Sequence, residues 1–419
     1  MRITQLKTIA DIQTGPFGSQ LHKEDYVETG TPIVTVEHLG NRVFTEQNLP
    51  RVSDSDKARL IKYTLSTGDI VFSRVGSVDR CSYVDKSHDG WMFSGRCLRV
   101  RPTELVDSLY LYYYFCLEET KQFVRNIAVG ATMPSINTKL LGEVEIALPD
   151  LNNQKRIAAV LSSLDDKIEN NQKLNDNLRQ QAQALFKKWF VDNPDAILWK
   201  EGTFSNLIEK TISGDWGKDS PSGNNTEMVY CIRGADIPEV RAGNKGKMPT
   251  RYILPKNYAA KQLVDGDIVV EISGGSPTQS TGRAAAVSDA LLARYDKGMV
   301  CTNFCKALKP RAGYSMYVYY YWQYLYDRDI FFSYENGTTG IKNLDINGFI
   351  ETEPIVIAPE DLVEKFDAVC QTVFSKIYAN GMENEQLALV RDTILPKLMS
   401  GEIDVSAVQL KAAKLSFTA

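Results

Sequence analysis

Residues 151–190 read LNNQKRIAAVLSSLDDKIENNQKLNDNLRQQAQALFKKWF. Apolar residues recur here at alternating steps of four and three over about five heptads, which is the pattern of a coiled-coil seam. The seam residues are Ile157, Leu161, Leu164, Ile168, Leu178, Leu185 and Trp189. A helix over roughly 151–191 is therefore predicted, with an amphipathic helix lying on a globular core as the alternative.

The same seam returns near the end of the chain, with every position shifted by 209 residues, and predicts a second helix over 360–400. Its members are Phe366, Cys370, Val373, Ile377, Leu387, Ile394 and Leu398. Two asparagines interrupt each seam at matching positions: Asn171 and Asn175 in the first, Asn380 and Asn384 in the second. Such a period marks an internal duplication, so the fold is interpreted as two copies of one unit.

The first helix must run from the first globular region to the second, and the second helix must start at the second region. If the two helices pack together, they are therefore antiparallel. This alignment brings Asn171 near Asn384 and Asn175 near Asn380. Buried seam asparagines fix register at some cost in stability, so replacing all four by leucine is expected to raise thermal stability and loosen register. Gly381 interrupts the second helix at a cost of about 1 kcal/mol, which puts its continuity in question.

Each copy also begins with short strands and turns, which predicts an α+β architecture. TGDIVFSRVGS (67–77) corresponds to DGDIVVEISGG (265–275), a Gly-Asp turn that leads into an apolar strand and a glycine loop. Aromatic runs follow at 109–124 and 316–332. These runs are predicted to be helices packed on the domain's own sheet, with base-stacking platforms as the alternative.

Composition restricts the function classes. At 419 residues and 43% hydrophobic, the chain can bury more than one core. Its net charge of −4 argues against a broad basic surface that coats nucleic acid, so any DNA contact is expected to be local. The seven cysteines lack paired spacing, the first 15 residues lack a signal peptide's apolar core, and no run could span a membrane. The sequence predicts a cytoplasmic protein.

Catalytic motifs are weak. The sequence lacks an Asn-Pro-Pro-Tyr motif for holding adenine and a glycine-rich cofactor fingerprint. Asp150, Asp165, Asp166 and Lys167 mimic the spaced carboxylates and lysine of a nuclease, but Asp165 and Lys167 fall inside the predicted helix. Cys301 and Cys305 stand four apart, without a second close pair for zinc; the three histidines, His22, His38 and His88, lie far away in sequence. A non-catalytic chain without a metal site is expected.

The pattern resembles a known family, the specificity subunit of type I restriction-modification systems. Residues 147–190 look like that family's central helix, and GATMPSIN (130–137) and LVRDTILPKLMSGEIDV (389–405) are similar to its usual segments. The order, spacing and duplication of these segments extend the resemblance over nearly the whole chain. One departure is ENGTTGIKN (335–343), which lacks the proline of its counterpart.

The resemblance implies two target recognition domains, each reading one half of a split DNA sequence, with the two helices as a spacer. It also implies that this chain methylates and cuts nothing itself. Two modification subunits would bind S-adenosylmethionine and methylate adenine, and restriction subunits would translocate and cleave, so Mg²⁺ and ATP are also expected on partners. The runner-up is a coiled-coil scaffold that binds proteins and no DNA, favoured by the acidic balance.

The predicted organisation places the first target recognition domain at 1–150, the central spacer helix at 151–192, the second recognition domain at 193–358, the C-terminal spacer helix at 359–402 and a tail at 403–419. The reading loops differ between the copies, which predicts a bipartite, asymmetric target.

DNA-contacting candidates are polar or basic loop residues, because arginine reads guanine, lysine pairs with phosphate, and hydroxyl or amide groups position a loop. An ordinary loop role is the alternative for each of them. In the first domain they are Arg74, Ser77, Arg80, Thr132 and Asn137; in the second they are Lys218, Lys245, Lys247, Arg283, Thr338 and Lys342.

Overall fold

The computed structural model describes residues 2–16, 18, 20–276, 278–337 and 341–408. It divides into two compact units: unit 1 holds 1–167 and 387–419, and unit 2 holds 168–386. The division cuts through both long helices, so the domain boundaries drawn from the sequence stay predictions. In the part of the chain that is described, no helix is both long enough and apolar enough to cross a membrane.

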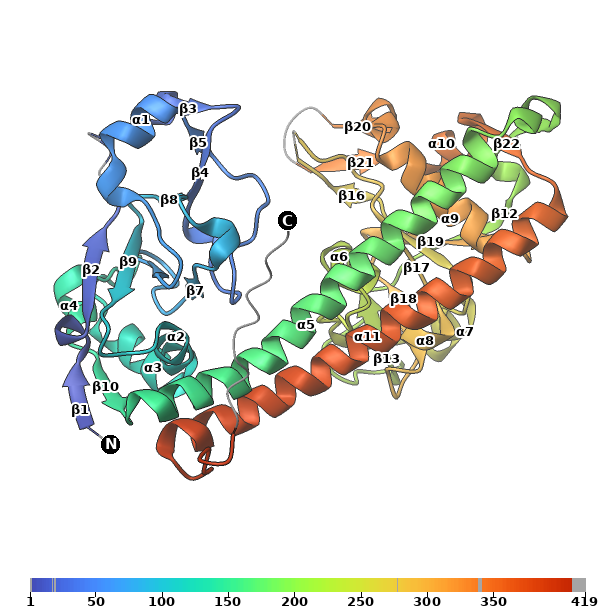
Figure 1. Ribbon diagram of the computed structural model, residues 1–419. Helices are drawn as coiled ribbons and strands as arrows, with labels where there is room; N and C mark the ends of the chain where they lie inside the picture. The colour runs from blue at the N-terminus through green and yellow to red at the C-terminus, as the bar shows by residue number, and fades with distance from the viewer. Residues whose placement is uncertain (1, 17, 19, 277, 338–340, 409–419) are drawn as a thin grey trace. The chain divides into compact units, whose positions relative to one another are not determined.

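Unit 1 carries a four-stranded antiparallel sheet and a smaller sheet beside it (Figure 1). The first has the order β2-β9-β6-β7, and the second, β3-β5-β4-β8, contains a parallel pair, β4 with β8. Strands β1 and β10 form a separate pair. The strands are β1 (Arg2–Gln5), β2 (Ala10–Thr14), β3 (Tyr26–Val27), β4 (Thr31–Val34), β5 (Arg51–Val52), β6 (Ile70–Ser73), β7 (Cys81–Tyr83), β8 (Met92–Phe93), β9 (Cys97–Pro102) and β10 (Glu145–Leu148). The helices are α1 (Asp54–Arg59), α2 (Ser108–Cys116), α3 (Glu118–Ile127), α4 (Thr138–Gly142) and the first part of α5 (Leu151–Phe186).

Unit 2 repeats the larger sheet and the separate strand pair in the same order, as the duplication predicts, but its smaller sheet, β14-β13-β18, has three strands instead of four. Its four-stranded sheet runs β12-β19-β15-β17, β13 pairs in parallel with β18, and β11 pairs with β22. A further small sheet, β16-β21-β20, joins two loops. The strands are β11 (Lys200–Thr203), β12 (Ile208–Ser213), β13 (Glu227–Ile232), β14 (Thr250–Ile253), β15 (Ile268–Glu271), β16 (Ser273–Gly274), β17 (Ala284–Ala286), β18 (Met299–Cys301), β19 (Cys305–Pro310), β20 (Glu335–Asn336), β21 (Lys342–Leu344) and β22 (Pro354–Ile357). The helices are α6 (Ile237–Arg241), α7 (Pro255–Lys261), α8 (Asp289–Leu292), α9 (Ser315–Tyr326), α10 (Ile346–Thr352) and most of α11 (Glu360–Ser400).

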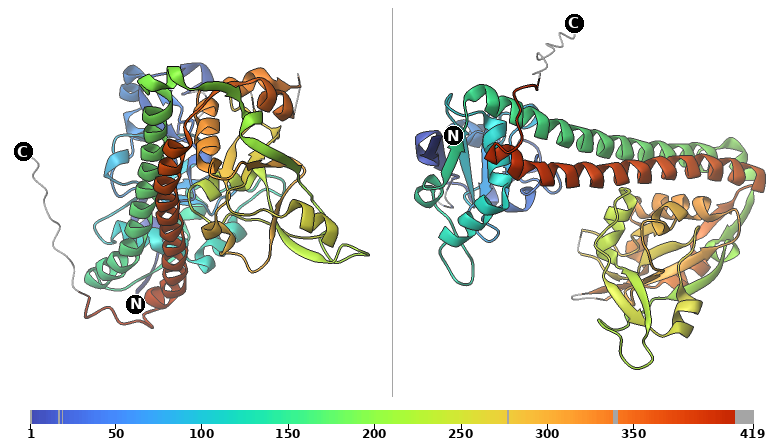
Figure 2. Two further views of the ribbon diagram at one scale, coloured as in Figure 1. Left: turned by 90° about the vertical axis from the view of Figure 1, so that its right-hand side faces the viewer. Right: turned by 90° about the horizontal axis from the view of Figure 1, so that it is seen from below.

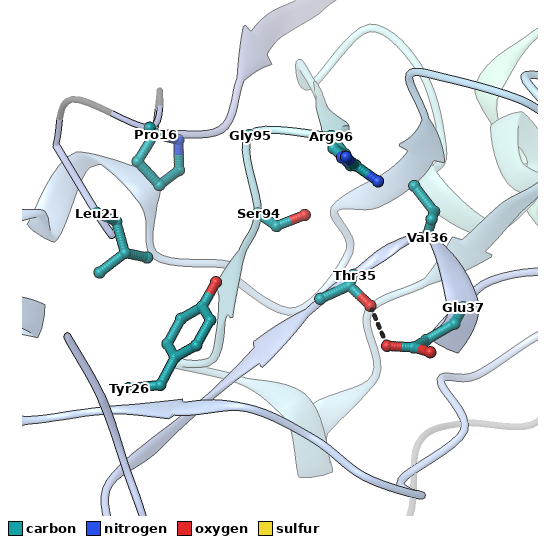
Figure 3. A pocket seen from close by; sticks show the side chains of 10 residues that line it. Pro16, Leu21, Tyr26, Thr35, Val36, Glu37, Ser94, Gly95 and Arg96 are labelled. Atoms are coloured by element: carbon teal, nitrogen blue, oxygen red, sulfur yellow. Dashed lines mark hydrogen bonds between the residues drawn. The ribbon is translucent and has the colours of Figure 1, made fainter. Parts of the chain in front are cut away.

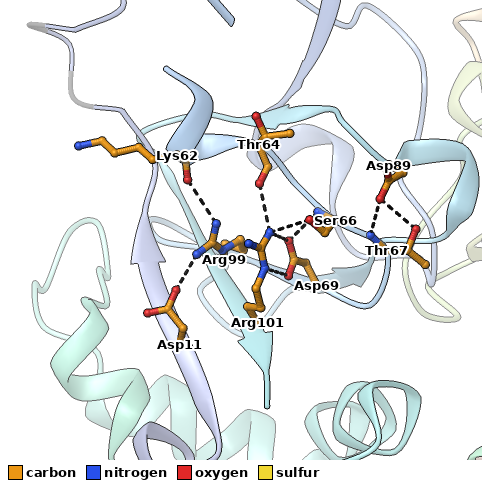
Figure 4. Close-up of polar contacts among 9 residues, drawn as sticks. All are labelled: Asp11, Lys62, Thr64, Ser66, Thr67, Asp69, Asp89, Arg99 and Arg101. Carbon is orange, nitrogen blue, oxygen red and sulfur yellow. Dashed lines mark hydrogen bonds and ion pairs between the residues drawn. The ribbon is translucent and has the colours of Figure 1, made fainter. Parts of the chain in front are cut away.

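The Gly-Asp turn has the same role in both units. In unit 1 the buried Asp69 accepts the Ser66 amide at 2.8 Å and two N–H groups of Arg101, from the neighbouring strand, at 2.7 Å each (Figure 4). In unit 2 Asp267 accepts the Val264 amide at 2.9 Å and Lys309 Nζ at 2.7 and 2.9 Å. The aspartate therefore both closes its turn and ties it to the next strand.

The aromatic runs are helices, and their rings are buried as predicted. Tyr110 and Tyr113 of α2 and Tyr317 and Trp322 of α9 are at most 2% exposed and belong to the cores of their units. The first run is broken at Leu117, where the extended backbone separates α2 from α3. This burial leaves these side chains unavailable for stacking on bases.

The two long helices pair in antiparallel fashion within each unit (Figures 1 and 2). In unit 1, Asp165 of α5 lies opposite Arg391 of α11. In unit 2, Asn171 Nδ2 donates to Asn384 Oδ1 at 2.9 Å, and Asn380 Nδ2 donates to Asn175 Oδ1 at 2.8 Å. These are the pairs that the antiparallel alignment predicts. That they determine the register stays a prediction.

The seam departs from the predicted one at the end of the first helix. Leu185 and Trp189 are only half-buried, whereas Ala182, Phe186 and Phe190 are buried. Phe186 packs against Tyr317 of α9 with ring centroids 5.7 Å apart, and the last turn, Lys187–Val191, is a π-helix. The helix thus turns its aromatic face toward the core of unit 2.

Gly381 does not interrupt α11, which runs unbroken from Glu360 to Ser400. The loop after α6 explains the glycine: a Cβ added at Gly381 would lie 1.9 Å from the carbonyl oxygen of Gly243. Only a residue without a side chain allows this approach. The doubt about the helix's continuity was wrong, and the glycine is a packing requirement.

The environment of Asn175 reverses the expected effect of leucine there. Besides its contact with Asn380, its Nδ2 donates to the carbonyl oxygens of Ala242 and Ile377, both at 3.0 Å. Asn175→Leu is expected to lower the stability of unit 2 by about 1–3 kcal/mol, because the Ala242 oxygen loses this donor.

Asn384→Leu is the matched control for this prediction. Asn384 Nδ2 is buried without a partner in the described part of the chain, and Asn171 keeps a bond to Glu383 at 2.8 Å after the change. Its thermal unfolding midpoint should fall less than that of Asn175→Leu. Equal midpoints for the two variants would contradict this assignment.

Candidate nucleic-acid interface

In unit 1 a cavity of about 540 Å³ lies where the parallel strands β4 and β8 end, and we call it the strand-end cavity. Its lining comes from the segments that follow β2, β4 and β8 and from β3. Figure 3 shows Leu21 and Tyr26 on one side and Thr35, Glu37 and Arg96 on the other. The described residues that line it are Pro16, Gly18, Leu21, Tyr26, Thr35, Val36, Glu37, Ser94, Gly95 and Arg96.

The cavity has three side chains with polar ends, Glu37, Arg96 and Tyr26, which differ in their bonding. Glu37 is exposed, and its Oε1 accepts the Thr35 hydroxyl at 3.1 Å. Arg96 is exposed as well, and its guanidinium has no hydrogen bond or ion pair within the residues that the structure describes. Burial, together with the neighbouring Asp25 carboxylate, raises the pKa of Tyr26, so its hydroxyl stays protonated at neutral pH. The cavity therefore offers donors on Arg96 and acceptors on Glu37.

The backbone around the cavity is held by hydrogen bonds and by one close approach. The Ser94 amide donates to Val34 O at 2.9 Å, and the Cys97 amide donates to Ser94 O at 2.9 Å. A Cβ at Gly15 would lie 2.1 Å from Ser94 O, so this close approach requires glycine. The turn Ser94–Arg96 is thus held between two strands and a glycine loop.

Three of the candidate residues in the first domain lie on loops that adjoin this turn. Arg74 donates from Nη1 to Gly95 O at 3.1 Å, and its amide bonds to Arg96 O at 2.8 Å. Ser77 and Thr132 are exposed on two neighbouring loops, which are joined by an isolated bridge between Val75 and Ser135. The fold therefore brings Arg74, Ser77 and Thr132 to one edge, next to the cavity.

Two other candidates in this domain have structural partners. The guanidinium of Arg80 donates to the carbonyl oxygen of Leu39. Asn137 is the N-cap of α4, and its Oδ1 accepts the Leu140 amide at 2.9 Å. These contacts account for both residues without DNA, and DNA contact by either stays a prediction.

In unit 2, two of the basic candidates are held in ion pairs. Arg283 forms a two-pronged pair with Glu271, with N–O distances of 2.6 and 2.7 Å. Lys342 Nζ bonds to Glu335 at 2.7 Å, and this contact, with others, lowers the pKa of Glu335 although burial alone would raise it. Reading a base with either side chain would first require breaking its ion pair.

Two lysine candidates of unit 2, Lys245 and Lys247, share the loop between α6 and β14, and Lys218 lies on another loop. Lys245 stacks over the Tyr295 ring at 4.6 Å, and its amide bonds to Glu385 of α11 at 3.3 Å. Lys218 and Lys247 are exposed on different loops. Thr338 lies outside the described residues. The DNA contacts of these lysines stay predictions.

Arg96 and Glu37 were not among the residues singled out from the sequence. Each follows one strand of a parallel pair whose members are far apart in the chain, and a single sequence does not show that pairing. Aligning the two copies could have drawn attention to Arg96, because Ser94-Gly95-Arg96 precedes β9 just as Thr302-Asn303-Phe304 precedes β19.

The residues of the nuclease-like and zinc-like sequence patterns are engaged in hydrogen bonds and ion pairs or are buried in the core. Asp165 accepts the Tyr113 hydroxyl at 2.6 Å and pairs with Arg391 at 2.5 Å, and Asp150 accepts the Asn153 amide at 3.0 Å at the start of α5. Cys301 and Cys305 are buried in the core of unit 2. Among the described residues, no group of three His, Cys, Asp or Glu side chains could hold a metal ion.

Comparison with known proteins finds relatives of one kind. Residues 1–180 match the family model described as the type I restriction modification DNA specificity domain. The chain is similar to the type I restriction enzyme MjaIX specificity subunit of Methanocaldococcus jannaschii, with 29% identity over 73% of this chain and 71% of the relative. It is also similar to the HindI specificity subunit of Haemophilus influenzae, with 24% identity over 82% of this chain and 88% of that protein. These matches make the chain similar to type I restriction-modification specificity subunits.

A solved structure supports the fold. The S subunit of a type I restriction-modification system from M. genitalium aligns over 95% of both chains with a TM-score of 0.53 at 17% identity. At that identity the likeness speaks for the fold alone. It agrees with the α+β architecture with two repeated units and two long helices that the sequence predicts.

Proposed function

We propose that this chain is the DNA sequence-recognition subunit of a type I restriction-modification complex and reads a bipartite, asymmetric target. The observation that carries the proposal is the turn before β9, Ser94–Arg96, and its counterpart before β19, Thr302–Phe304. It is held by the same backbone bonds in both units but carries different exposed side chains, Arg96 in one and Phe304 in the other. One framework with two sets of exposed groups suits the reading of two different half-sites.

The proposal includes partners that carry the chemistry. Two modification subunits would bind S-adenosylmethionine and methylate adenine, and restriction subunits would use Mg²⁺ and ATP to cleave. Exposed apolar side chains on the long helices support docking of protein partners. In unit 2 these are Leu174, Val369 and Met382, and in unit 1 they are Leu151, Leu389 and Val390. The present chain would supply recognition and no catalysis, which fits the structural engagement of Asp150 and Asp165.

The long helices are proposed to set the gap between the half-sites. Removing one heptad, about 10.5 Å of helix, from both α5 and α11 is expected to shorten the gap by about three base pairs. The half-sites themselves should not change. A control in which the same heptad is replaced by another of equal length and seam pattern should keep the original gap. An unchanged gap after the deletions would refute the spacer role.

A selection from randomised DNA tests the proposed function. The full chain, purified with its modification subunit, is incubated with a library of randomised duplexes, and the bound duplexes are sequenced. Enrichment of a split, gapped motif is expected, and the modification subunit alone should enrich none. Association of the two proteins without any enriched sequence would instead support the scaffold.

A further inference from the structure

We propose that Arg96 and Glu37 are specificity-determining residues that together read one G·C base pair in the half-site bound by unit 1. The inference rests on the proposed function and adds the base pair and the residues that read it. It starts from the strand-end cavity, where both side chains are exposed and lie on the same side (Figure 3).

The chemistry of the two groups matches the major-groove edge of that base pair. Guanine presents the acceptors O6 and N7, which the forked N–H groups of arginine can bond together, and cytosine presents a donor, its N4 amino group, to a carboxylate. Arg96 has no protein partner among the described residues, so reading a base breaks no existing ion pair. Within the described ranges Glu37 accepts only the Thr35 hydroxyl, and it keeps acceptor capacity for an amino group.

Unit 2 provides an internal comparison, because the turn is built in the same way there. The Thr302 amide donates to Ile232 O at 3.0 Å, and the Cys305 amide donates to Thr302 O at 2.9 Å. A Cβ at Gly214 would lie 1.9 Å from Thr302 O, as at Gly15 in unit 1. These bonds place Phe304 at the position of Arg96.

The position of Glu37 is fixed in the same way. The Thr35 amide donates to His38 Nδ1 at 2.9 Å, and the Arg233 amide donates to Asp236 Oδ2 at 3.1 Å, so Ala235 takes the place of Glu37. Unit 2 thus has an exposed phenyl ring, 61% accessible, and an exposed methyl group where unit 1 has the arginine and the carboxylate. Neither can hydrogen-bond to a base, whereas an apolar ring suits the methyl group of thymine. The two units therefore differ in the base pair that this position accepts.

The test uses the same selection from randomised duplexes with variants of the full chain. Arg96→Ala should relax the preference for guanine at one position of one half-site by about 5- to 150-fold, as expected for the loss of one forked contact. Arg96→Gln should shift that position toward adenine, whose N6 and N7 suit an amide. Glu37→Ala should relax the same base pair. The matched control, Arg2→Ala, removes an exposed arginine of β1 that does not line the cavity, and should leave the motif unchanged.

A transplant tests the assignment in the opposite direction. Phe304→Arg combined with Ala235→Glu, two exposed positions, should create a G·C preference in the other half-site. The inference is overturned if both Arg96 variants select the wild-type motif, or if the affected half-site holds no G·C pair. Failure of the proposed function looks different, because wild-type protein would then enrich no sequence at all.

Discussion

Gly381→Ala is expected to destabilise unit 2, although alanine is the better helix former. Helix propensity alone would favour alanine by about 1 kcal/mol. In the structure, however, the new Cβ would meet the carbonyl oxygen of Gly243 at 1.9 Å. Backbone atoms cannot move aside as a flexible side chain can, and overpacking of this kind costs typically about 1–3 kcal/mol and occasionally more. A net loss of about 2 kcal/mol should lower the unfolding midpoint by about 4–8 °C.

Two further variants give this prediction its controls. Gln172 stands 209 residues before Gly381 on α5 and is exposed, so Gln172→Ala should leave the midpoint nearly unchanged. Gly243 has a φ of +85°, and a Cβ there would lie 2.5 Å from Ile377 O, so Gly243→Ala should also destabilise. A Gly381→Ala protein with a raised midpoint would contradict the close approach of the loop to the helix.

Asp165→Ala is expected to destabilise unit 1 by about 3 kcal/mol, the lower end of the range for breaking a buried pair. Asp165 is 5% exposed, receives the Tyr113 hydroxyl at 2.6 Å and pairs with Arg391 at 2.5 Å. Its removal leaves the Tyr113 hydroxyl without an acceptor and Arg391 without its main anion. Arg391 keeps Asp392 at 2.8 Å, which limits the loss. The unfolding midpoint should fall by about 6–12 °C.

The neighbouring carboxylate is the matched control. Asp166 is 57% exposed and pairs with Arg42 at 2.5 Å; the Arg42 side chain is 16% exposed but also donates to Ser162 O, so it keeps a partner when Asp166 is removed. Asp166→Ala should therefore change the midpoint much less. Equal effects of the two substitutions in calorimetry would show that the Asp165 pair is not the buried tie between α5 and α11 described above.

The helical part of the fold was predictable from the sequence, because apolar spacing and duplication are local signals. The 209-residue shift marked both long helices, and their polar interruptions predicted which asparagines would face each other. The burial of Tyr110 and Tyr317 followed from the usual role of aromatic side chains. Gly381 was misjudged because helix propensity says nothing about a loop that approaches from elsewhere in the chain.

The candidate interface was less predictable, because residue type alone does not reveal partners. Arg283 and Lys342 have the right chemistry for DNA, yet both are held by a glutamate of a neighbouring strand, Glu271 and Glu335. Arg96 was overlooked because its interest depends on the parallel pairing of β4 with β8, which brings it to the same cavity as Glu37. Strand pairing therefore decides two things that residue type does not show: which basic residues have an ion-pair partner, and which residues meet at one cavity.

The most direct test of the central claim is single-molecule sequencing of genomic DNA from cells that express this chain with its methyltransferase, compared with cells that lack only this chain. We expect a split, gapped, adenine-methylated motif that is present only with the chain and whose two halves differ. Identical methylation in both strains, with the two proteins shown to associate, would contradict the account.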